Sequence, residues 1–377
     1  MRNASFAIFL AALLILAVPI GSGEASAEGL EPIEYTLGDG TVIRFSGQIN
    51  MGVLHYDDGQ DDFTNFVDND NSSSRVRLQI LNTTGEWKFE STLEAEYQPL
   101  ASNTVSQLDE SPDWDFPSTN VRKAEVAFAN EQFGKLWLGQ GSMASDGSAE
   151  VDNSGTAVIA YSSLSDTAGG YFFGFDGGGL SDVTVGGAFS NFDGMGRKLR
   201  VRYDTPTFHG FGLRMSYGED ALAKRDDPLY DIAAVYSGDF DQFDLDGAIA
   251  YSRNDGSDVD FLSGSISGLH KPTGISLTLA SAREFTEGTE GSYGYVKLGY
   301  EREFFEIGST AFSVDYYFGN DIAAAGSDSE SVGLAAVQNI DAYNLQLWAL
   351  WRDYSYDDDG GEYDDGQAVF GGALFKF

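Results

Sequence analysis

The feature that most constrains this chain is a period-two alternation of apolar and polar residues, which recurs along most of its length. Within residues 43–53, the odd positions are apolar or glycine, whereas the even positions from Arg44 to Asn50 are polar. Residues 86–97 and 242–253 repeat the pattern with charged residues on the polar side. Because successive side chains of a strand point to opposite faces, these segments are predicted to be β-strands with one apolar and one polar face.

The connections between the predicted strands alternate between short and long. Short turns such as 82–85 and 130–134 are followed by acidic segments of ten residues or more. The long segments are 57–72, 98–120, 142–197, 219–228 and 357–366. The strands of a soluble β-sandwich alternate as well, but short periplasmic turns and long extracellular loops are typical of outer-membrane barrels. Since backbone groups in lipid must be paired, the sheet is expected to close. The sequence therefore predicts an all-β fold, an antiparallel transmembrane β-barrel.

The alternating segments give a strand count of sixteen. They are residues 41–56, 73–82, 86–97, 121–129, 135–141, 198–205, 211–218, 229–237, 242–253, 259–269, 274–283, 292–302, 309–319, 330–339, 342–356 and 367–377. Two further candidates, 171–175 and 182–191, lie inside the long segment 142–197, and the count is eighteen if both cross the membrane. A barrel of ~16–18 strands encloses an aqueous channel rather than a packed core.

The N-terminus has the three parts of a secretory signal peptide. Arg2 is followed by the apolar stretch 6–18 and by Ala25-Ser26-Ala27, an A-x-A cleavage site. The apolar stretch is shorter than the ~20 residues that a membrane-spanning helix needs. We therefore expect residues 1–27 to be removed on export and residues 28–377 to form a single barrel domain in the outer membrane.

The charge balance is strongly acidic, with a formal net charge of −37. Nucleic-acid binding needs a basic footprint, which this composition excludes. A soluble protein with a halophilic surface and a barrel with acidic extracellular loops would both carry such a charge.

The parity of each strand predicts which basic side chains line the channel. They are the residues opposite the apolar set, namely Arg44, Arg75, Arg77, Lys88, Lys123, Arg200 and Arg202. Arg122 shares its parity with Ala124 and Phe128, so it is expected to face lipid or to lie at a rim. Charged rings in a pore set its ion preference. The alternative is that these cations have no selective role, and are either hydrated side chains in a wide channel or partners of Glu90, Glu94 and Glu96.

The C-terminal strand and four further stretches resemble the Gram-negative general porins. The alternating run that ends with Phe375 and Phe377 resembles the assembly signal of outer-membrane barrels. The stretches FSGQINMGVL (45–54), SSRVRLQI (73–80), VRKAEVAFANEQFGKLWLGQ (121–140) and RKLRVRYDTPTFHGFGLRMSYGED (197–220) are similar, in this order, to successive strands and hairpins of that family.

The resemblance implies a homotrimer of barrels that insert into outer-membrane lipid with the help of the barrel assembly machinery. It implies that the third loop, about 142–197, folds inward and narrows the channel. The acids Asp146, Glu150 and Asp152 are then expected to face the basic wall. The loop is long and lacks the Pro-Glu-Phe-Gly-Gly stretch of enteric relatives, and its residues 171–191 are a candidate for an extra hairpin.

The function expected from this reading is passive diffusion of small hydrophilic solutes and ions, with a modest cation preference. The alternatives are a substrate-specific channel for anions or sugars and, less favoured, an outer-membrane enzyme. The chain has no G-x-S-x-G elbow, and the spacing of its three histidines does not suit a metal site. No cofactor is expected. Asp68-Asn69-Asp70 begins like a calcium loop but lacks its central glycine, so loose calcium binding by loop acids stays open.

Overall fold

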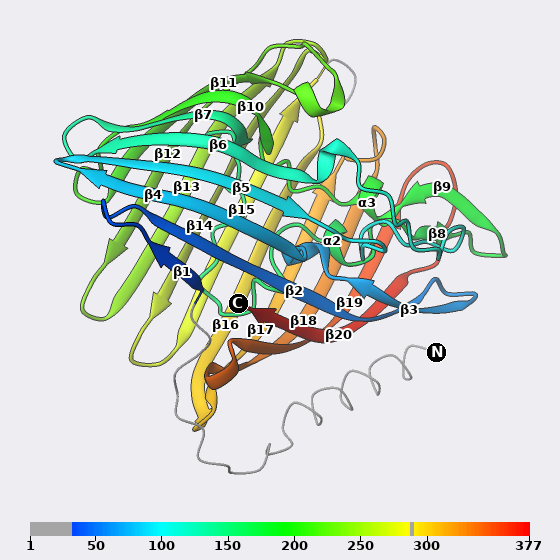
Figure 1. The fold of residues 1–377 in the computed structure, drawn as a ribbon. Coiled ribbons are helices and arrows are strands. Elements are labelled where there is room, and N and C mark those ends of the chain that lie inside the picture. The colour runs from blue at the N-terminus through cyan, green and yellow to red at the C-terminus, as the bar shows by residue number, and fades with distance from the viewer. Residues whose placement is uncertain (1–31, 287–289) are drawn as a thin grey trace.

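A computed structural model describes residues 32–286 and 290–377 and shows a closed β-barrel (Figure 1). Eighteen strands pair in one antiparallel sheet, and sixteen of them form the ring. These are β2 (Val42–Asp57), β4 (Arg75–Thr84), β5 (Trp87–Glu96), β6 (Val121–Asn130), β7 (Gly134–Ser142), β10 (Arg197–Asp204), β11 (Phe211–Glu219), β12 (Leu229–Asp239), β13 (Phe243–Asn254), β14 (Val259–His270), β15 (Ile275–Phe285), β16 (Ser292–Phe305), β17 (Gly308–Asn320), β18 (Asp328–Ile340), β19 (Leu345–Asp357) and β20 (Gly366–Lys376). All sixteen predicted strands are confirmed, with ends that differ by three residues at most.

The barrel closes where β20 pairs with β2. The register places Gln48 opposite Lys376 and Asp57 opposite Gln367. Below that contact, the amide of Phe377 donates to the carbonyl of Gly47 at 3.0 Å, and the amide of Gly47 donates to the carbonyl of Phe377 at 2.8 Å. The expected closure of the last strand on the first is therefore present down to the final residue.

Two strands lie outside the ring, and both pair with β2. The strand β1 (Ile33–Thr36) pairs with the start of β2, below the end of β20. The strand β3 (Asp62–Asp68) pairs with the second half of β2, above β4. The two candidate strands inside 142–197 form a separate small sheet of β8 (Phe172–Gly174) and β9 (Leu180–Thr184). Because they do not join the ring, the count is sixteen and the alternative of eighteen is wrong.

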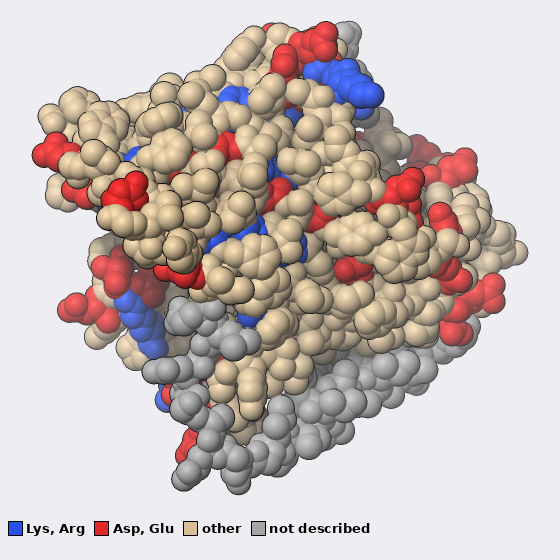
Figure 2. All heavy atoms as spheres, in the orientation of Figure 1, with Lys and Arg blue, Asp and Glu red and all other residues tan. Residues whose placement is uncertain are grey.

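The outer surface of the wall is apolar. On β15, Leu277 and Leu279 are nearly half exposed, whereas Ser276 and Thr278, on the other face, are buried. Figure 2 shows acidic side chains gathered at the ends of the molecule, with a mostly uncharged surface and scattered charges between them. An apolar band around the barrel is what a lipid environment requires. In the described residues, no helix is long and apolar enough to span a membrane.

Short turns lie at one end of the barrel and eight loops at the other. The turn after β18 contains η4 (Asp341–Tyr343). We name the loops in chain order: L1 (58–74), L2 (97–120), L3 (143–196), L4 (220–228), L5 (255–258), L6 (286–291), L7 (321–327) and L8 (358–365). L1 contains β3 and η1 (Asp70–Ser72), L2 contains η2 (Ser118–Asn120) and L4 contains η3 (Ala221–Ala223).

L3 fills one side of the barrel interior, as predicted. It contains α2 (Ser165–Ala168), β8, β9 and α3 (Val185–Ala188). Its buried rings stack on rings of the wall: Tyr171 lies 4.3 Å from Tyr56 between ring centroids, and Phe189 lies 5.3 Å from Tyr317. This apolar contact covers the inner faces of β2 and β15–β20. The open channel is therefore confined to the opposite side of the barrel. The predicted signal peptide, residues 1–27, lies outside the described residues.

Candidate functional site: a constriction inside the barrel

The first arm of L3 follows the inner wall and is held by hydrogen bonds. The amide of Ser145 donates to Asp231 on β12 at 2.8 Å, and the amide of Val151 donates to the Ser265 hydroxyl on β14 at 2.9 Å. Further along, Thr156 and Ser313 on β17 join their hydroxyls at 2.8 Å. Small hydroxyl side chains on the wall let the backbone of L3 approach closely. These hydrogen bonds therefore fix the first part of L3 against the wall at several points.

Asp152 does not face the channel, which corrects the expectation that it contributes to the constriction. Its carboxylate lies 2.7 Å from the ammonium group of Lys297 on β16, and both side chains are almost completely buried. Lys297 also donates to the carbonyl of Ala160 at 2.5 Å. A buried charge is tolerated only with a partner, and Asp152 is this partner. Its role is therefore to anchor L3.

Asp146 and Glu150 are partly exposed in L3, and their place at the constriction stays a prediction. Glu150 accepts a hydrogen bond from Asn191 at 2.9 Å. Three further acids lie within electrostatic reach of this pair or of one another. They are Asp70 of L1 and Asp166 and Asp193 of L3. We call these five residues the acidic strip. The sequence analysis missed the last three acids. L1, which carries Asp70, and the part of L3 that carries Asp166 and Asp193 approach Asp146 and Glu150 only in the folded protein.

Burial, together with repulsion between neighbouring carboxylates, raises the pKa of four acids of the strip, Asp70, Glu150, Asp166 and Asp193. Burial, with repulsion from Asp166, raises the pKa of Asp70 to about 7. Burial also raises the pKa of Glu150 to about 7, opposed by the hydrogen bond from Asn191. The pKa of Asp166 is raised to about 6 and that of Asp193 is raised as well, both mainly by burial. Asp70, Glu150 and Asp166 therefore change their charge near neutral pH.

Arg75 and Arg77 lie on the inner face of β4, opposite its exposed apolar side chains, and their role in a constriction stays a prediction. Arg77 lies 2.5 Å from Glu94, and its side chain is about one third exposed. Arg75 donates to the side-chain oxygen of Gln48 at 3.3 Å and forms no ion pair within the described residues. Lys123, the third predicted cation on this part of the wall, lies 4.0 Å from Glu125.

Arg122 points into the barrel, so the expectation that it faces lipid or a rim is wrong. The register between β5 and β6 shifts, with Glu94 opposite Lys123 but Ala95 opposite Val121. Arg122 is the extra residue of this β-bulge, and a bulge redirects a side chain. Its guanidinium lies 2.8 Å from Glu94 and also pairs with Glu96. Counting alternate residues along the sequence cannot detect such an inserted residue, so it assigns Arg122 to the wrong face.

Two more cations on this side of the barrel were missed by the sequence analysis. Arg197, the first residue of β10, lies within electrostatic reach of both Glu150 and Arg75. Lys376 on β20 shares the level of Arg75, because both are register partners of Gln48. Parity assigns a residue to the inner face but does not give its height, so only the assembled barrel shows which cations share a level.

Arg200 and Arg202 are buried and support the start of L3 rather than facing the solute. Arg200 donates to the carbonyls of Gly139 at 3.1 Å and Ser142 at 3.0 Å, and pairs with Glu125. Arg202 lies 2.7 Å from Asp204 and donates to the carbonyl of Met143 at 3.0 Å. With their donors used inside the wall, these two candidates do not form the constriction.

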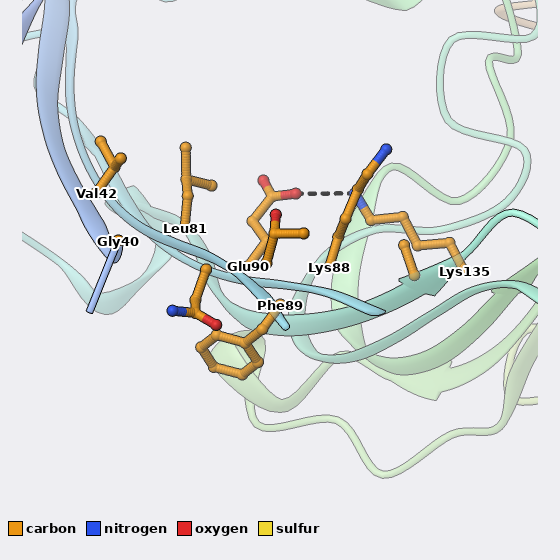
Figure 3. Close-up of a pocket in the computed structure, with 10 residues that line it drawn as sticks. Gly40, Val42, Leu81, Lys88, Phe89, Glu90 and Lys135 are labelled. Carbon is orange, nitrogen blue, oxygen red and sulfur yellow. Dashed lines mark hydrogen bonds and ion pairs between the residues drawn. The ribbon is translucent and has the colours of Figure 1, made fainter. Parts of the chain in front are cut away.

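Arg44 and Lys88 lie at the end of the barrel that carries the short turns, also away from the constriction. Arg44 lies 2.5 Å from Glu34 of β1. Lys88 is exposed and lines a hollow of about 340 Å³ in this mouth, beside the Glu90–Lys135 ion pair of 2.8 Å (Figure 3). The cations predicted from parity are thus spread over the full height of the channel.

Within the described residues, no three histidine or acidic side chains converge in a way that would hold a metal ion. Several aromatic residues of the inner wall, including Tyr56, Tyr317 and Trp348, are buried under L3, whereas Trp137 on β7 is partly exposed beneath Lys135. The ring of Phe377 lies 5.9 Å from that of Phe45 at the seam of the barrel.

Comparisons with known proteins agree with this architecture. A family model described as Gram-negative porin matches residues 10–359. A search of curated proteins found no match. Among solved structures, an anion-selective porin from Comamonas acidovorans is similar with a TM-score of 0.62 and 17% identity, covering 89% of this chain and 100% of that one.

Two further structures are similar at lower scores. The outer-membrane protein OmpT of Vibrio cholerae has a TM-score of 0.57 at 14% identity, covering 92% of this chain and 100% of that one. The outer-membrane channel DcaP of Acinetobacter baumannii has a TM-score of 0.54 at 11% identity, covering 93% and 100%. At these identities the likeness concerns the fold.

Proposed function

The chain belongs to the Gram-negative porins, and from that premise we propose that its outer-membrane pore prefers cations modestly. The pore itself serves passive diffusion of small hydrophilic solutes and ions, as the family and the open side of the barrel indicate. The new element is the sign of the selectivity. The Comamonas relative is described as anion-selective, so the preference must be argued from the charges of this chain.

The observation that carries the proposal is the acidic strip. None of its five carboxylates forms an ion pair within the described residues, so their charge is not offset by direct contact. The extracellular loops add many acids around the entrance, within a total of 59 acidic and 22 basic residues. Negative potential at a mouth raises the local cation concentration over a distance of ~10 Å at 0.1 M salt.

The basic wall opposes this effect only in part. Arg77 and Arg122 share Glu94, and Arg122 also pairs with Glu96. Arg200 is buried against Glu125. Among the cations at this level, Arg75, Arg197 and Lys376 have no ion-pair partner within the described residues. Three such cations face five such acids, so the balance favours cations when the strip is ionised.

Liposome swelling tests this function directly. With the protein in the vesicle wall, swelling rates in neutral sugars are expected to fall steeply with solute size. Between a cationic and an anionic solute of equal size, the cationic one is expected to enter faster at low salt. Equal rates, or a faster anion, would contradict the proposed preference while leaving the diffusion pore intact.

We also propose that the protein assembles as a homotrimer with the help of the barrel assembly machinery, and that it has no enzymatic activity. One solved form of the Vibrio protein is described as a trimer, which supports the assembly. The family supports a transport role rather than catalysis. A sugar-specific channel is less favoured, because aromatic side chains of the inner wall such as Tyr56, Tyr317 and Trp348 are covered by L3.

A further inference from the structure

The hollow in the mouth that carries the short turns is built on two neighbouring rows of the inner wall. In one row, Val42 of β2 is the register partner of Leu81 of β4, and Leu81 is also opposite Glu90 of β5. In the next row, Lys88 of β5 is opposite Ala129 of β6. Side chains that are register partners on one face of a sheet lie next to each other. The volume of the hollow, about 340 Å³, is within the range of known ligand pockets.

Val42 and Leu81 form an apolar patch inside the channel. The adjacent residues on the inner face of the same strands are polar: Arg44 on β2, and Gln79 and Thr83 on β4. Val42 and Leu81 are partly exposed, and Figure 3 shows both side chains pointing into the open interior of the barrel. Because contact between apolar surface and water is unfavourable, a solute with an apolar body would be stabilised by covering this patch.

Lys88 is the cation of the hollow whose charge is offset least. Its ammonium group lies 3.6 Å from Glu131 in the turn between β6 and β7, but the two side chains are 63% and 93% exposed. An ion pair so exposed contributes little free energy, so a solute can replace it. Figure 3 shows the ammonium group of Lys88 pointing away from the wall, toward the same space as Leu81 and Val42.

Glu90 and Lys135, which also line the hollow, offset each other. Their charged groups lie 2.8 Å apart. Gln79 donates a further hydrogen bond to Glu90 at 3.2 Å, and the ammonium group of Lys135 lies 3.7 Å from the ring centroid of Trp137. Both charges thus have their contacts within the wall. The positive charge that remains beside the apolar patch is that of Lys88.

We propose that this hollow binds small monocarboxylates with an apolar body, with the carboxylate at Lys88 and the apolar body over Val42 and Leu81. A single negative charge matches the single available cation, whereas a second one would face Glu90 and Glu131. A solute without an apolar body gains nothing from the patch. Such solutes are held at the periplasmic mouth of the channel, apart from the acidic strip. The site therefore does not rest on the sign of the proposed ion preference.

Binding is measured by fluorine NMR of para-fluorobenzoate, titrated with the refolded protein in detergent, with empty micelles as the blank. Unlabelled solutes are then added as competitors. Benzoate should displace the probe. Acetate has the charge without the ring, and benzylammonium has the ring with the opposite charge. Each should be at least about threefold less effective than benzoate, because each lacks one of the two contacts.

Variants of the hollow test each contact separately, once the heat-modifiable barrel of each variant is confirmed. K88A should raise the Kd of the probe roughly threefold, because it removes one partly exposed charge contact. L81N should raise the Kd by roughly the same factor, because it removes apolar contact. K271A is the matched control. It removes a lysine from another turn of the same mouth, where Lys271 pairs with Asp239 and Asp244, and should leave the Kd unchanged.

An equal loss of binding in K88A and K271A would show that the mouth attracts anions only through its overall charge, and would overturn the site. Unchanged binding in K88A would overturn it as well. If L81N binds the probe as the wild type does, or if acetate competes as well as benzoate, the apolar patch takes no part and the proposed class of ligand is wrong.

Discussion

The ammonium group of Lys297 lies 2.7 Å from the carboxylate of Asp152, and both side chains are almost fully buried between L3 and the wall. The two residues are 145 positions apart in the sequence. This ion pair fixes the middle of the L3 arm, so the width of the channel depends on a contact that is not itself in the channel.

Replacing Lys297 with Met should therefore loosen L3 without changing the charge of the channel surface. Breaking a buried ion pair by removing one partner costs about 3–5 kcal/mol. Single-channel recordings should show a larger or noisier conductance than the wild type. In the double variant K297M/D152N, which leaves no unpaired charge, the conductance should move back toward the wild type. A quiet wild-type conductance in K297M would show that the pair does not position L3.

Neutralising the acidic strip should lower the cation preference. We expect E150Q and D146N each to shift the zero-current potential in a salt gradient toward zero, because both residues are partly exposed and neither has an ion-pair partner within the described residues. K297M/D152N is the matched control, since it removes the buried Asp152 carboxylate without leaving Lys297 unpaired. An effect of this double variant on selectivity as large as that of E150Q would contradict the assignment of Asp152 as an anchor.

Neutralising the wall should have the opposite effect. R75Q and R77Q are expected to increase the cation preference, because both guanidinium groups lie on the channel side. R122Q should also increase the cation preference, whereas a residue on the lipid face, where parity alone would place Arg122, should have no effect. R44Q, at the far mouth, is the control of equal charge. If R122Q resembles R44Q rather than R77Q, Arg122 does not contribute to the constriction.

The selectivity should depend on pH between about 5 and 8. Burial raises the pKa of Asp70 and Glu150 to about 7 and that of Asp166 to about 6. Below these values the carboxyl groups are mostly protonated and the cation preference is weak; above them the groups ionise and the preference grows. Zero-current potentials at fixed gradient, measured at pH 5 and pH 8, should show this rise. The rise should be flatter in D70N/E150Q. It should not vanish, because Asp146, Asp166 and Asp193 of the strip remain, and Arg122 and Arg197 still face the strip.

The same shifts predict a pH dependence of stability with a definite sign. A raised pKa means that the folded protein holds protons which the unfolded chain has already released. The stabilising contribution of these acids is therefore present at low pH and is lost as the pH rises through their folded-state values. In D70N/E150Q the urea midpoint should change less between pH 5 and pH 8 than in the wild type. An equal change in both proteins would exclude these residues as its source.

Deleting Phe377 should lower the yield of folded barrel. The deletion removes two backbone hydrogen bonds to Gly47 and the ring contact with Phe45 at the seam. The measurement is the fraction of heat-modifiable barrel on a gel after refolding. F377L keeps the backbone bonds and should fold better than the truncated chain. Equal yields from the truncated and intact chains would count against a role of Phe377 in closure.

The strands were predictable from sequence because each is defined locally. The alternation in 43–53 already separates the lipid face from the channel face, and the same rule puts Arg75 and Arg77 on the inner face of β4. The rule fails at Arg122, where a bulge inserts one residue between Glu94 and Ala95. It also cannot give the height of a residue, which is why Arg44 and Lys88 were grouped with residues far above them.

The loop residues were predicted less well because their surroundings come from distant parts of the chain. Asp152 was assigned to the constriction since nothing near it in sequence indicates Lys297. Asp70 was missed because L1 meets L3 only when the barrel has closed. Asp146 and Glu150 were assigned to the constriction because the resemblance to porins places the start of the third loop inside the channel, and this assignment stays a prediction.

The measurement that tests the central claim most directly is the zero-current potential of the wild-type protein in a planar bilayer, under a gradient of potassium chloride at pH 7.5. The acidic strip and the loop acids predict a potential with the sign of a cation-selective channel. The potential should be larger at 0.1 M than at 1 M salt, because salt screening shortens the distance over which the loop charges act. A potential of the opposite sign at low salt would contradict the account and would show that the basic wall determines the selectivity.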